Sequence, residues 1–259
     1  MAERFIVLKF GGTALGSARR IRTAARRLIA LHRKGVRTLA VVSATGHTTD
    51  RITRRLAAVG ADPAGAPSRE TDRALATGEL LSAALLAAAI ESAGIPATSL
   101  SGTGAGLSAS GPWSAGVLES LDPAPLRRLL ARGIIPVVAG FQAGTASGEQ
   151  ITLGRGASDL SAVFLAARLG ADECHIVTDV SGVFDRDPRH HPGAGRHGWL
   201  APAALARLVD SGAEVVHHRA ARLAAEERLT LRVYRWDANI RGAPGTLIAP
   251  ERPGAAAAS

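Results

Sequence analysis

The sequence predicts an α/β fold with a mainly parallel β-sheet covered by helices on both faces. Short apolar runs alternate with longer segments of helical periodicity along the 259 residues, the pattern of repeated βαβ units. Hydrophobic residues make up 46% of the chain but aromatic residues only 3%. The core must therefore be built mainly from aliphatic side chains, which suit helices packed on a parallel sheet. A chain of this length buries roughly three quarters of its unfolded surface, so we expect one large domain over residues 1–250.

The individual elements follow from the spacing of apolar residues. Phe5–Leu8 has the length of a buried strand, Ser17–Lys34 has helical periodicity with a basic face, and Arg37–Ser43 completes a first βαβ unit. Glycine, proline and polar clusters separate the later elements. The later predicted strands are Ala97–Leu100, Ile134–Val138, Glu173–Thr178 and Thr230–Tyr234. The later predicted helices are Asp50–Val59, Ser68–Ala93 (as one helix or two), Pro123–Arg132, Asp159–Leu169, Pro202–Ser211 and His218–Glu227.

Composition excludes several classes of protein. The net charge of +9 comes almost entirely from dispersed arginines with few aromatic neighbours, so we expect no nucleic-acid partner. The one cysteine, Cys174, excludes an internal disulfide framework, and there is neither a leader-like segment nor an apolar stretch of about 20 residues without charge. We therefore expect a cytoplasmic protein without a membrane partner. No metal site is expected, because His190, His191 and His197 lie among proline, glycine and arginine without an acidic partner.

Two glycine turns, each with an embedded charge, indicate the chemistry. Lys9 is followed by Gly11 and Gly12 directly after the first apolar run, and Gly154–Asp159 lies far downstream. A lysine at the carboxyl edge of a sheet, beside backbone N–H groups unobstructed by side chains, can hold a phosphoryl group. Only Lys9 and Lys34 are lysines, which suggests that position 9 requires a compact point charge. A Gly-Gly pair alone is more often a simple strand-to-helix turn.

Five segments, in order, resemble the catalytic domain of aspartate kinases in the amino-acid kinase family. They are Lys9–Thr13, Ser43–Asp50, Gly78–Ser82, Gly154–Asp159 and Thr178–Val183. The resemblance covers about residues 4–249 and implies a three-layer αβα sandwich, with an amino-acid site mainly in residues 1–150 and a nucleotide site mainly in residues 151–250. It further implies ATP-dependent phosphorylation of the side-chain carboxylate of aspartate or a close analogue to an acyl phosphate, Mg²⁺ held mainly by the nucleotide, and a homodimer. Residues 251–259 are expected to be a disordered tail.

The resemblance also assigns roles to individual residues. Phosphoryl transfer requires positioned charge, and an amino acid requires an acid for its ammonium and an arginine fork for its carboxylate. The implied catalytic residues are Lys9 and Asp159. The implied substrate-binding residues are Ser43, Thr49, Glu79, Phe141, Arg155 and Asp159. The implied ATP-binding residues are Lys9, Gly11, Gly12, Thr178, Asp179, Asp185, Arg186 and Arg189.

Local structural roles compete with these assignments. Glu79 could be an acid in the first turn of a helix, where it would interact with the helix dipole. Arg155 and Asp159, four residues apart, could form a local ion pair. Ser43 could be a strand-end hydroxyl, and Thr49 or the following aspartate a helix N-cap.

Three departures from the family pattern limit the assignment of activity. Glu214 stands where aspartate kinases usually have a phosphate-contacting lysine, and Ala14 replaces a serine beside the first glycine turn. Either an arginine such as Arg186, Arg219 or Arg222 substitutes for that lysine, or the chain is a non-catalytic amino-acid- or nucleotide-binding paralogue or a partner of an active kinase. The sequence also stops shortly after residue 248, where most aspartate kinases continue into regulatory domains, so feedback inhibition within this polypeptide is not expected.

Overall fold

A computed structural model describes residues 4–188, 190–213, 215–239 and 245–252. Its main sheet has eight strands in the order β10-β12-β11-β9-β1-β2-β6-β3, and only β11 and β12 pair antiparallel. The predicted mainly parallel sheet is confirmed. The strands are β1 (Phe5–Phe10), β2 (Arg37–Val42), β3 (Ala97–Leu100), β6 (Ile135–Ala139), β9 (Glu173–Thr178), β10 (Trp199–Leu200), β11 (Leu231–Arg235) and β12 (Thr246–Ile248).

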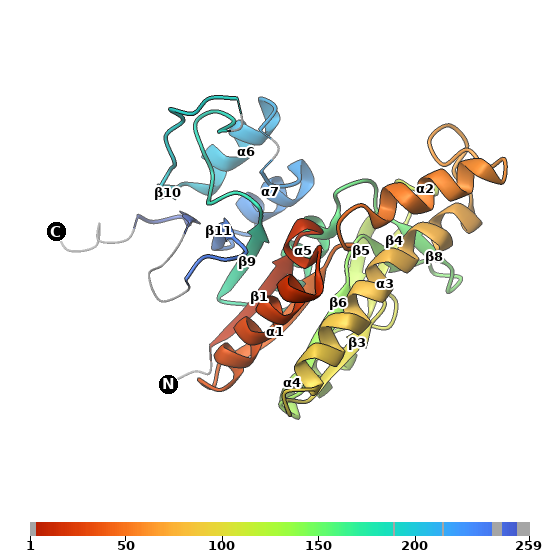
Figure 1. Ribbon diagram of the computed structural model, residues 1–259, viewed down its shortest axis with the longest axis horizontal. Coiled ribbons are helices and arrows are strands. Elements are labelled where there is room, and N and C mark those ends of the chain that lie inside the picture. Colours follow the sequence, from red (N-terminus) through yellow and green to blue (C-terminus); the bar gives the residue numbers. More distant parts are fainter. Residues whose placement is uncertain (1–3, 189, 214, 240–244, 253–259) are drawn as a thin grey trace.

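Helices cover both faces of this sheet, which gives three layers (Figure 1). Helices α1 and α3 pack side by side on one face, while α5, α4 and the α6–α7 pair pack on the other. Each predicted helix is present to within about two residues, and the segment predicted as one or two helices is the single helix α3. The helices are α1 (Ala18–His32), α2 (Thr48–Ala58), α3 (Arg69–Glu91), α4 (Ala124–Ala131), α5 (Ser158–Leu169), α6 (Pro202–Asp210) and α7 (His218–Glu226), with a short 3₁₀ turn η1 (Thr13–Leu15).

Alternation along β1 decides which way its lysine points. Val7 packs into the core on the α5 side, whereas Ile6, Leu8 and Phe10 pack into the core under α1 and α3. Successive side chains of a strand point to opposite faces, so Lys9 shares the face of Val7 and points toward α5. The strand extends two residues beyond its predicted end, which places Lys9 inside the sheet, in register with Val41 and Ile176.

A second sheet of four short strands was not predicted. It has the order β5-β4-β7-β8, and its strand β8 lies against α3, the helix that carries Glu79. The main sheet was predicted from apolar runs, and the strands of the second sheet are too short and too polar to form such runs. Strands β10 and β12 of the main sheet were also too short to be predicted in this way. The strands of the second sheet are β4 (Leu107–Ser110), β5 (Val117–Leu121), β7 (Gln142–Gly144) and β8 (Gln150–Thr152).

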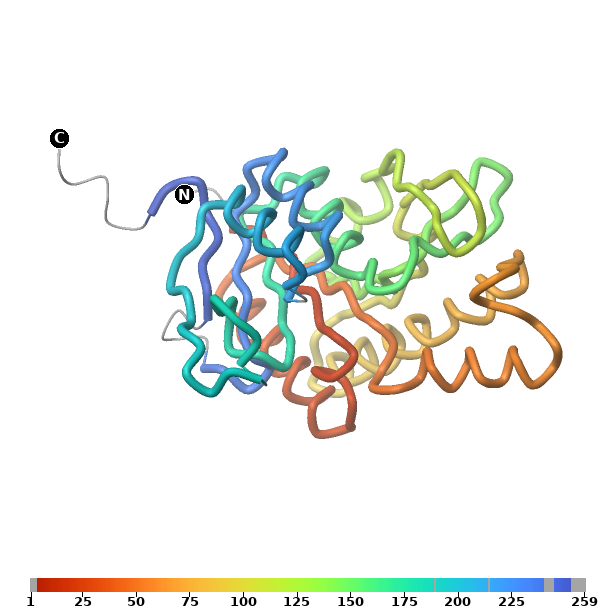
Figure 2. Tube along the Cα trace, turned by 90° about the horizontal axis from the view of Figure 1, so that it is seen from above, coloured from red at the N-terminus to blue at the C-terminus, as the bar shows by residue number. Residues whose placement is uncertain are grey.

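The C-terminal segments of the chain and the segments that include α2 and the second sheet lie at opposite ends of the molecule. Figure 2 shows the blue C-terminal segments gathered at one end and the orange to light-green segments at the other. The red strand β1 and α5 lie between them, because β1 pairs with both β2 and β9. Helix α3 has the length and apolarity of a membrane span, but half of its most apolar stretch is buried inside the protein. Most of the predicted tail, 253–259, lies outside the described residues.

Candidate active site

A buried ion pair joins the two predicted catalytic residues. Lys9 Nζ lies 2.8 Å from Asp159 Oδ1, and each side chain is only 11% exposed. Asp159 is in the first turn of α5, directly above the face of β1 that carries Lys9. Its other oxygen, Oδ2, accepts a hydrogen bond of 3.0 Å from the backbone N–H of His217. Asp159 therefore fixes the position of the lysine ammonium and is itself fixed by the N-terminus of α7.

The first glycine turn is bonded to the loop that follows β2. Gly46 N–H donates to the carbonyl of Gly12 over 2.9 Å, and a Cβ on Gly12 would lie 2.5 Å from the carbonyl oxygen of Ala44. Only glycine fits this close approach. Gly11 N–H donates to the carbonyl of Val177, so it is engaged within the protein rather than open to an anion as the sequence suggested. A Cβ on Gly11 would lie 3.5 Å from Lys9 Nζ, an ordinary van der Waals contact, so the close approach that requires glycine is at Gly12 rather than at Gly11.

Glu79 holds the same loop from α3. Its Oε1 accepts a hydrogen bond of 2.9 Å from the backbone N–H of Ala44, while Oε2 is buried without a hydrogen-bond partner among the described residues. Burial raises the pKa of Glu79 to about 7, and the Ala44 hydrogen bond and the charge of Lys9 only partly oppose that rise. Glu79 is well inside α3, whose first-turn acids are Glu70 and Asp72. The interpretation of Glu79 as a first-turn acid is therefore wrong.

We expect the raised pKa of Glu79 to appear in the pH dependence of stability. The folded protein binds this proton more tightly than the unfolded chain, so the stabilisation is complete below pH 4.5 and is lost as pH rises to about 7. The loss is on the order of 3 kcal/mol. Urea unfolding at intervals between pH 4.5 and 8 should show this decline in the wild type and not in Glu79→Gln. The exposed Glu91 on the same helix provides a control: Glu91→Gln should retain the wild-type decline, and a decline of equal size in Glu79→Gln contradicts the prediction.

Arg155 lies on the exposed loop between β8 and α5, where its side chain is 90% exposed. Its Nη2 forms an ion pair of 3.0 Å with Asp50 Oδ1 on α2. The alternative of a local pair between Arg155 and Asp159 is wrong, because each of them has another partner. The N-cap role suggested for Thr49 or Asp50 is also wrong, since α2 begins at Thr48 and both residues are in its first turn.

Phe141 has a backbone conformation that bulky residues rarely adopt. Its φ is +69°, a strain of order 1–3 kcal/mol that surrounding contacts must sustain. Ser161 Oγ accepts from Phe141 N–H at 3.1 Å, and the Phe141 carbonyl accepts from Leu153 N–H at 2.9 Å. Ser43, at the end of β2, is half-buried and bonds through its backbone N–H to Phe10. Strand ends and the loop of Arg155 are thus tied together at one edge of the sheet.

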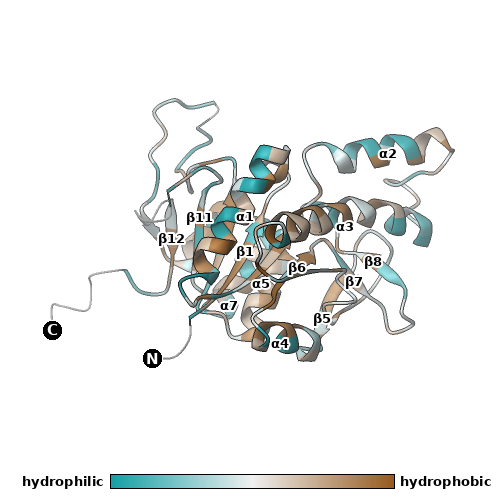
Figure 3. Cartoon of the chain, turned by 60° about the horizontal axis from the view of Figure 1, so that its bottom comes forward, coloured by the Kyte–Doolittle hydropathy of each residue, from teal (hydrophilic) through white to brown (hydrophobic). Residues whose placement is uncertain are grey.

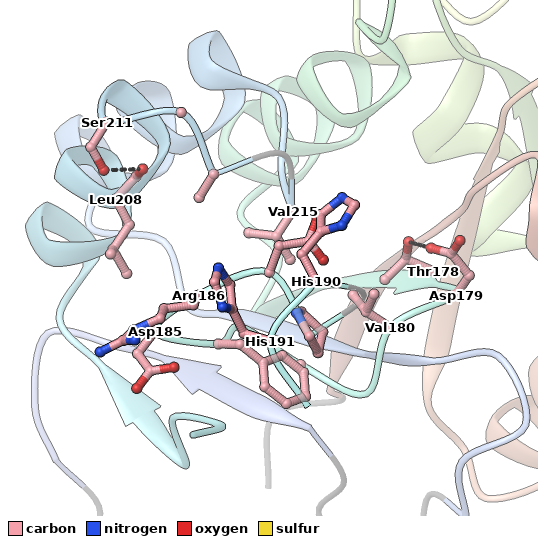
Figure 4. A pocket seen from close by; sticks show the side chains of 16 residues that line it. Thr178, Asp179, Val180, Asp185, Arg186, His190, His191, Leu208, Ser211 and Val215 are labelled. Carbon is pink, nitrogen blue, oxygen red and sulfur yellow. Dashed lines mark hydrogen bonds and ion pairs between the residues drawn. The ribbon is translucent and has the colours of Figure 1, made fainter. Parts of the chain in front are cut away.

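A pocket of about 480 Å³ opens between the end of β9, the loop that follows it and the end of α6 (Figure 4). The predicted nucleotide residues Thr178, Asp179, Asp185 and Arg186 all line it. Thr178 Oγ1 donates to Asp179 Oδ1 over 3.1 Å. The prediction for Arg189 lies outside the described residues.

A second pocket, of about 390 Å³, lies between this region and the ion pair. It is lined by Asp159, Gly156, His217 and His218, and it shares Gly212, Ala213 and Val215 with the first pocket. The N-terminus of α7 therefore lies between the larger pocket and Asp159. The two histidine rings stack with centroids 4.4 Å apart, and burial lowers the pKa of His217.

Comparison with known proteins identifies this arrangement. The model of the amino acid kinase family matches residues 4–235. The chain belongs to the amino acid kinase family. The aspartokinase of Geobacillus stearothermophilus is 41% identical over 237 residues, which are 92% of this chain and 58% of the relative. Aspartokinase 2 of Bacillus subtilis (strain 168) is 39% identical over 246 residues, 95% of this chain and 59% of the relative. The chain thus spans somewhat more than half the length of these relatives.

Solved structures agree with the family assignment. The aspartate kinase from Synechocystis superposes with a TM-score of 0.82 at 34% identity, covering 95% of this chain and 40% of that chain. E. coli aspartokinase III in complex with aspartate and ADP gives a TM-score of 0.83 at 23% identity, covering 97% of this chain and 66% of that chain. The UMP kinase from Bacillus anthracis gives 0.70 at 19% identity, covering 96% and 97%. The last two show the fold alone, and the predicted fold class is confirmed.

Glu214, which stands where the family usually has a lysine, lies outside the described residues. The described residues do bear on which arginine could take the place of that lysine. Among the arginines that could substitute for the family's lysine, Arg222 forms an ion pair of 2.9 Å with Asp210, and Arg219 donates to backbone carbonyls. Arg186 alone of the three lines the larger pocket.

Sequence reasoning missed two residues that hold this candidate site together, Asp72 and His217, and it considered Arg219 only as a substitute for the family's lysine rather than as a donor to backbone carbonyls. Asp72 precedes Glu79 by seven residues on α3, a spacing that puts both on the same helix face, and this was the available signal. No local pattern marks the backbone N–H of His217 or the carbonyl contacts of Arg219, because both depend on segments far apart in the sequence.

Proposed function

We propose that this chain transfers the γ-phosphoryl group of ATP to the side-chain carboxylate of aspartate or a close analogue, forming an acyl phosphate. The single observation that carries the proposal is the position of the Lys9–Asp159 pair, whose Asp159 lines a pocket that shares Gly212, Ala213 and Val215 with the larger pocket of about 480 Å³. A phosphoryl group entering from the larger pocket would meet a lysine whose position is fixed before binding. The aspartokinase relatives support the choice of acceptor.

The geometry supports a direct transfer. A carboxylate oxygen of the acceptor attacks the γ-phosphorus, the bond from phosphorus to the β–γ bridging oxygen breaks, and ADP leaves with that electron pair. Negative charge spreads over the equatorial oxygens in the transition state, and Lys9 Nζ is the group that would stabilise it. Glu79 suits the acceptor's ammonium, because its Oε2 has no hydrogen-bond partner among the described residues. Arg155 suits the α-carboxylate of the acceptor.

The larger pocket suits a nucleotide. Its volume lies within the usual range for small-ligand sites, and it offers an arginine beside carboxylate and hydroxyl oxygens. Magnesium prefers oxygen ligands, which Asp179 and Asp185 could supply in addition to those of the nucleotide. When bound, the ion neutralises charge on the phosphates. Residues 1–150 and 151–250 would then be the amino-acid and nucleotide halves of one domain of a cytoplasmic enzyme.

We expect Arg186 to provide the charge that the lysine at position 214 provides in relatives. Arg186→Ala should weaken ATP binding about 10- to 100-fold, since a hydrogen bond to a charged group is worth about 1.5–3 kcal/mol. Calorimetric titration with ATP measures the change. Arg222→Ala serves as the matched control, because Arg222 is paired with Asp210 at the surface. Equal affinities in the two variants contradict the role of Arg186.

An ADP-release assay with a panel of amino acids, in which acyl phosphate is trapped as hydroxamate, tests the proposed function. Hydroxamate formation with aspartate or one analogue is the expected result. The replacement at position 214 favours a second candidate, a non-catalytic binding paralogue. That candidate predicts ATP or aspartate binding by calorimetry without ADP release from any amino acid of the panel.

We also propose that the chain forms a homodimer through the outer face of α3, which Figure 3 shows as mainly hydrophobic. Leu81 and Leu85 are 53% and 42% exposed there. An antiparallel pair of α3 helices related by a two-fold axis would bury Leu81 and Leu85 of one subunit against the same residues of the partner subunit, so the face can pair with a second copy of itself.

Leu81→Glu should convert the dimer to a monomer, because it places a charge in the middle of this apolar face. Light scattering coupled to size-exclusion chromatography measures the mass. Val59→Glu, at a position that is 81% exposed beyond the end of α2, is the control and should remain dimeric. A monomeric wild type, or a Leu81→Glu dimer, overturns the proposed interface.

A further inference from the structure

Arg219 connects the nucleotide pocket to the loop of Arg155. It is the second residue of α7, and its guanidinium donates to two backbone carbonyls that are distant in sequence. The distances are 3.1 Å from Nη1 to the carbonyl of Leu153 and 3.3 Å from both Nη1 and Nη2 to the carbonyl of Gly116. No acidic partner is recorded for Arg219 in the described part of the chain. Its contacts therefore hold backbone rather than neutralise charge.

The carbonyls of Leu153 and Gly116 both lie next to the start of the Gly154–Gly156 loop. Leu153 immediately precedes Gly154, Arg155 and Gly156, and the two glycines have φ values of +92° and +81°. Gly116 N–H in turn donates to the carbonyl of Thr152 over 2.9 Å. Glycines on both sides give this loop few backbone restraints of its own. Apart from the Arg155–Asp50 ion pair and a hydrogen bond from Ala157 N–H to the Gly154 carbonyl, the contacts that hold the loop are at its ends, and Arg219 holds the first of them.

The second end of the loop contacts the same helix. Asp159, one residue into α5, accepts from the backbone N–H of His217, which directly precedes α7. The N-terminus of α7 thus holds both ends of the Gly154–Gly156 loop, through a side chain at one end and a backbone N–H at the other. Immediately before α7, residues Gly212, Ala213 and Val215 line the nucleotide pocket.

Asp72 of α3 holds the segment that leads into this loop from its other side. This fully buried carboxylate accepts from Thr152 N–H at 2.6 Å and from Ser114 N–H at 3.0 Å through Oδ2, and from Ser114 Oγ at 2.7 Å through Oδ1. One side of the loop's entry is therefore held by α3 in the core. The other side is held by α7, which follows shortly after the pocket-lining residues Gly212, Ala213 and Val215 in the sequence.

We infer that Arg219 is a positioning residue that couples occupancy of the nucleotide pocket to the order of the Arg155 loop, and so to binding of the acceptor. The inference rests on the proposed function for the identities of the two ligands. A nucleotide that contacts the lining residues Ser211, Gly212, Ala213 and Val215 restrains the N-terminus of α7, and Arg219 transmits that restraint to Leu153. Such coupling is reciprocal and typically amounts to about 5- to 150-fold in affinity.

Hydrogen–deuterium exchange with and without Mg-ADP tests the coupling without any acceptor present. In the wild type, ADP should slow exchange in peptides covering residues 178–191, which line the pocket, and also in peptides covering 150–160. In Arg219→Gln the first protection should persist and the second should disappear. Arg222→Ala, one turn further along α7, should behave as the wild type. Arg219→Lys, which keeps a donor, should retain part of the protection and serves if Arg219→Gln does not fold.

The outcomes separate this inference from the proposed function. Protection of 150–160 by ADP in both Arg219 variants at the wild-type level overturns the role of Arg219, as does protection in the wild type confined to 178–191. Absence of protection at 178–191 in the wild type instead overturns the nucleotide pocket itself, and with it both proposals. In a parallel titration, ADP should tighten wild-type aspartate binding by about fivefold or more, and Arg219→Gln should reduce this to less than about twofold.

Discussion

Lys9→Met should lower the rate of phosphoryl transfer by about 10²- to 10³-fold, because it removes the one ammonium placed to meet charge in the transition state. It should also destabilise the fold. Asp159 would remain buried with its negative charge uncompensated, a situation that typically costs about 3–5 kcal/mol. Hydroxamate formation measures the first effect, and urea unfolding at pH 7 measures the second.

A double variant separates the two roles of this pair. Lys9→Met combined with Asp159→Asn removes both charges, while the Asn side-chain oxygen can still accept from the His217 N–H. The double variant should be more stable than Lys9→Met alone yet equally inactive. If instead Lys9→Met retains wild-type turnover, Lys9 has no part in the reaction. If the double variant is no more stable than the single one, the ion pair does not account for the loss.

Asp72→Ala should be the most destabilising of the changes outside the reacting centre. It leaves the Thr152 N–H, the Ser114 N–H and the Ser114 hydroxyl without their acceptor, and each buried unsatisfied group costs about 1–3 kcal/mol. A total of about 4 kcal/mol should lower the midpoint of thermal unfolding by roughly 10 °C in a chain of this size. Scanning calorimetry measures the shift.

The first turn of α3 supplies the control for this prediction. Glu70 is an acid two residues earlier whose side chain is 70% exposed, so Glu70→Ala should change stability by no more than about 0.5 kcal/mol. Asp72→Asn should lie between the two, because one of its two acceptor oxygens remains. Equal midpoints for the alanine variants at positions 70 and 72 would show that water replaces the carboxylate without cost.

The main sheet and its helices could be predicted because each leaves a strong periodic signal. Runs such as Glu173–Thr178 are buried on both faces, and helices such as α3 carry a serine N-cap before a long apolar stripe. The four-stranded second sheet could not be predicted in this way. Its strands are three to five residues long, and their pairing depends on neighbours that are distant in sequence.

The candidate site divides along the same line. Lys9 and Asp159 could be placed together because Lys9 directly precedes one glycine turn and Asp159 follows another, and the structure joins them by an ion pair. The partner of Arg155, by contrast, is Asp50, 105 residues away. Asp72 and Arg219 bind mainly backbone groups. Backbone groups are nearly the same at every position, so a sequence gives no signal for such contacts. Contacts of this kind become visible only once the fold is known.

The position of β1 has a consequence for synthesis of the protein. This strand lies between β2, which follows it closely, and β9, where Asp172 accepts from the N–H of Phe5 across a separation of 167 residues. At ribosomal rates of about 5–20 residues per second, β9 emerges roughly 8–30 s after β1. During that interval the nascent chain carries an apolar strand with one unpaired edge, which is a template for association with other chains. The strand that holds the lysine of the site thus has one edge that stays unpaired until β9 has been synthesised.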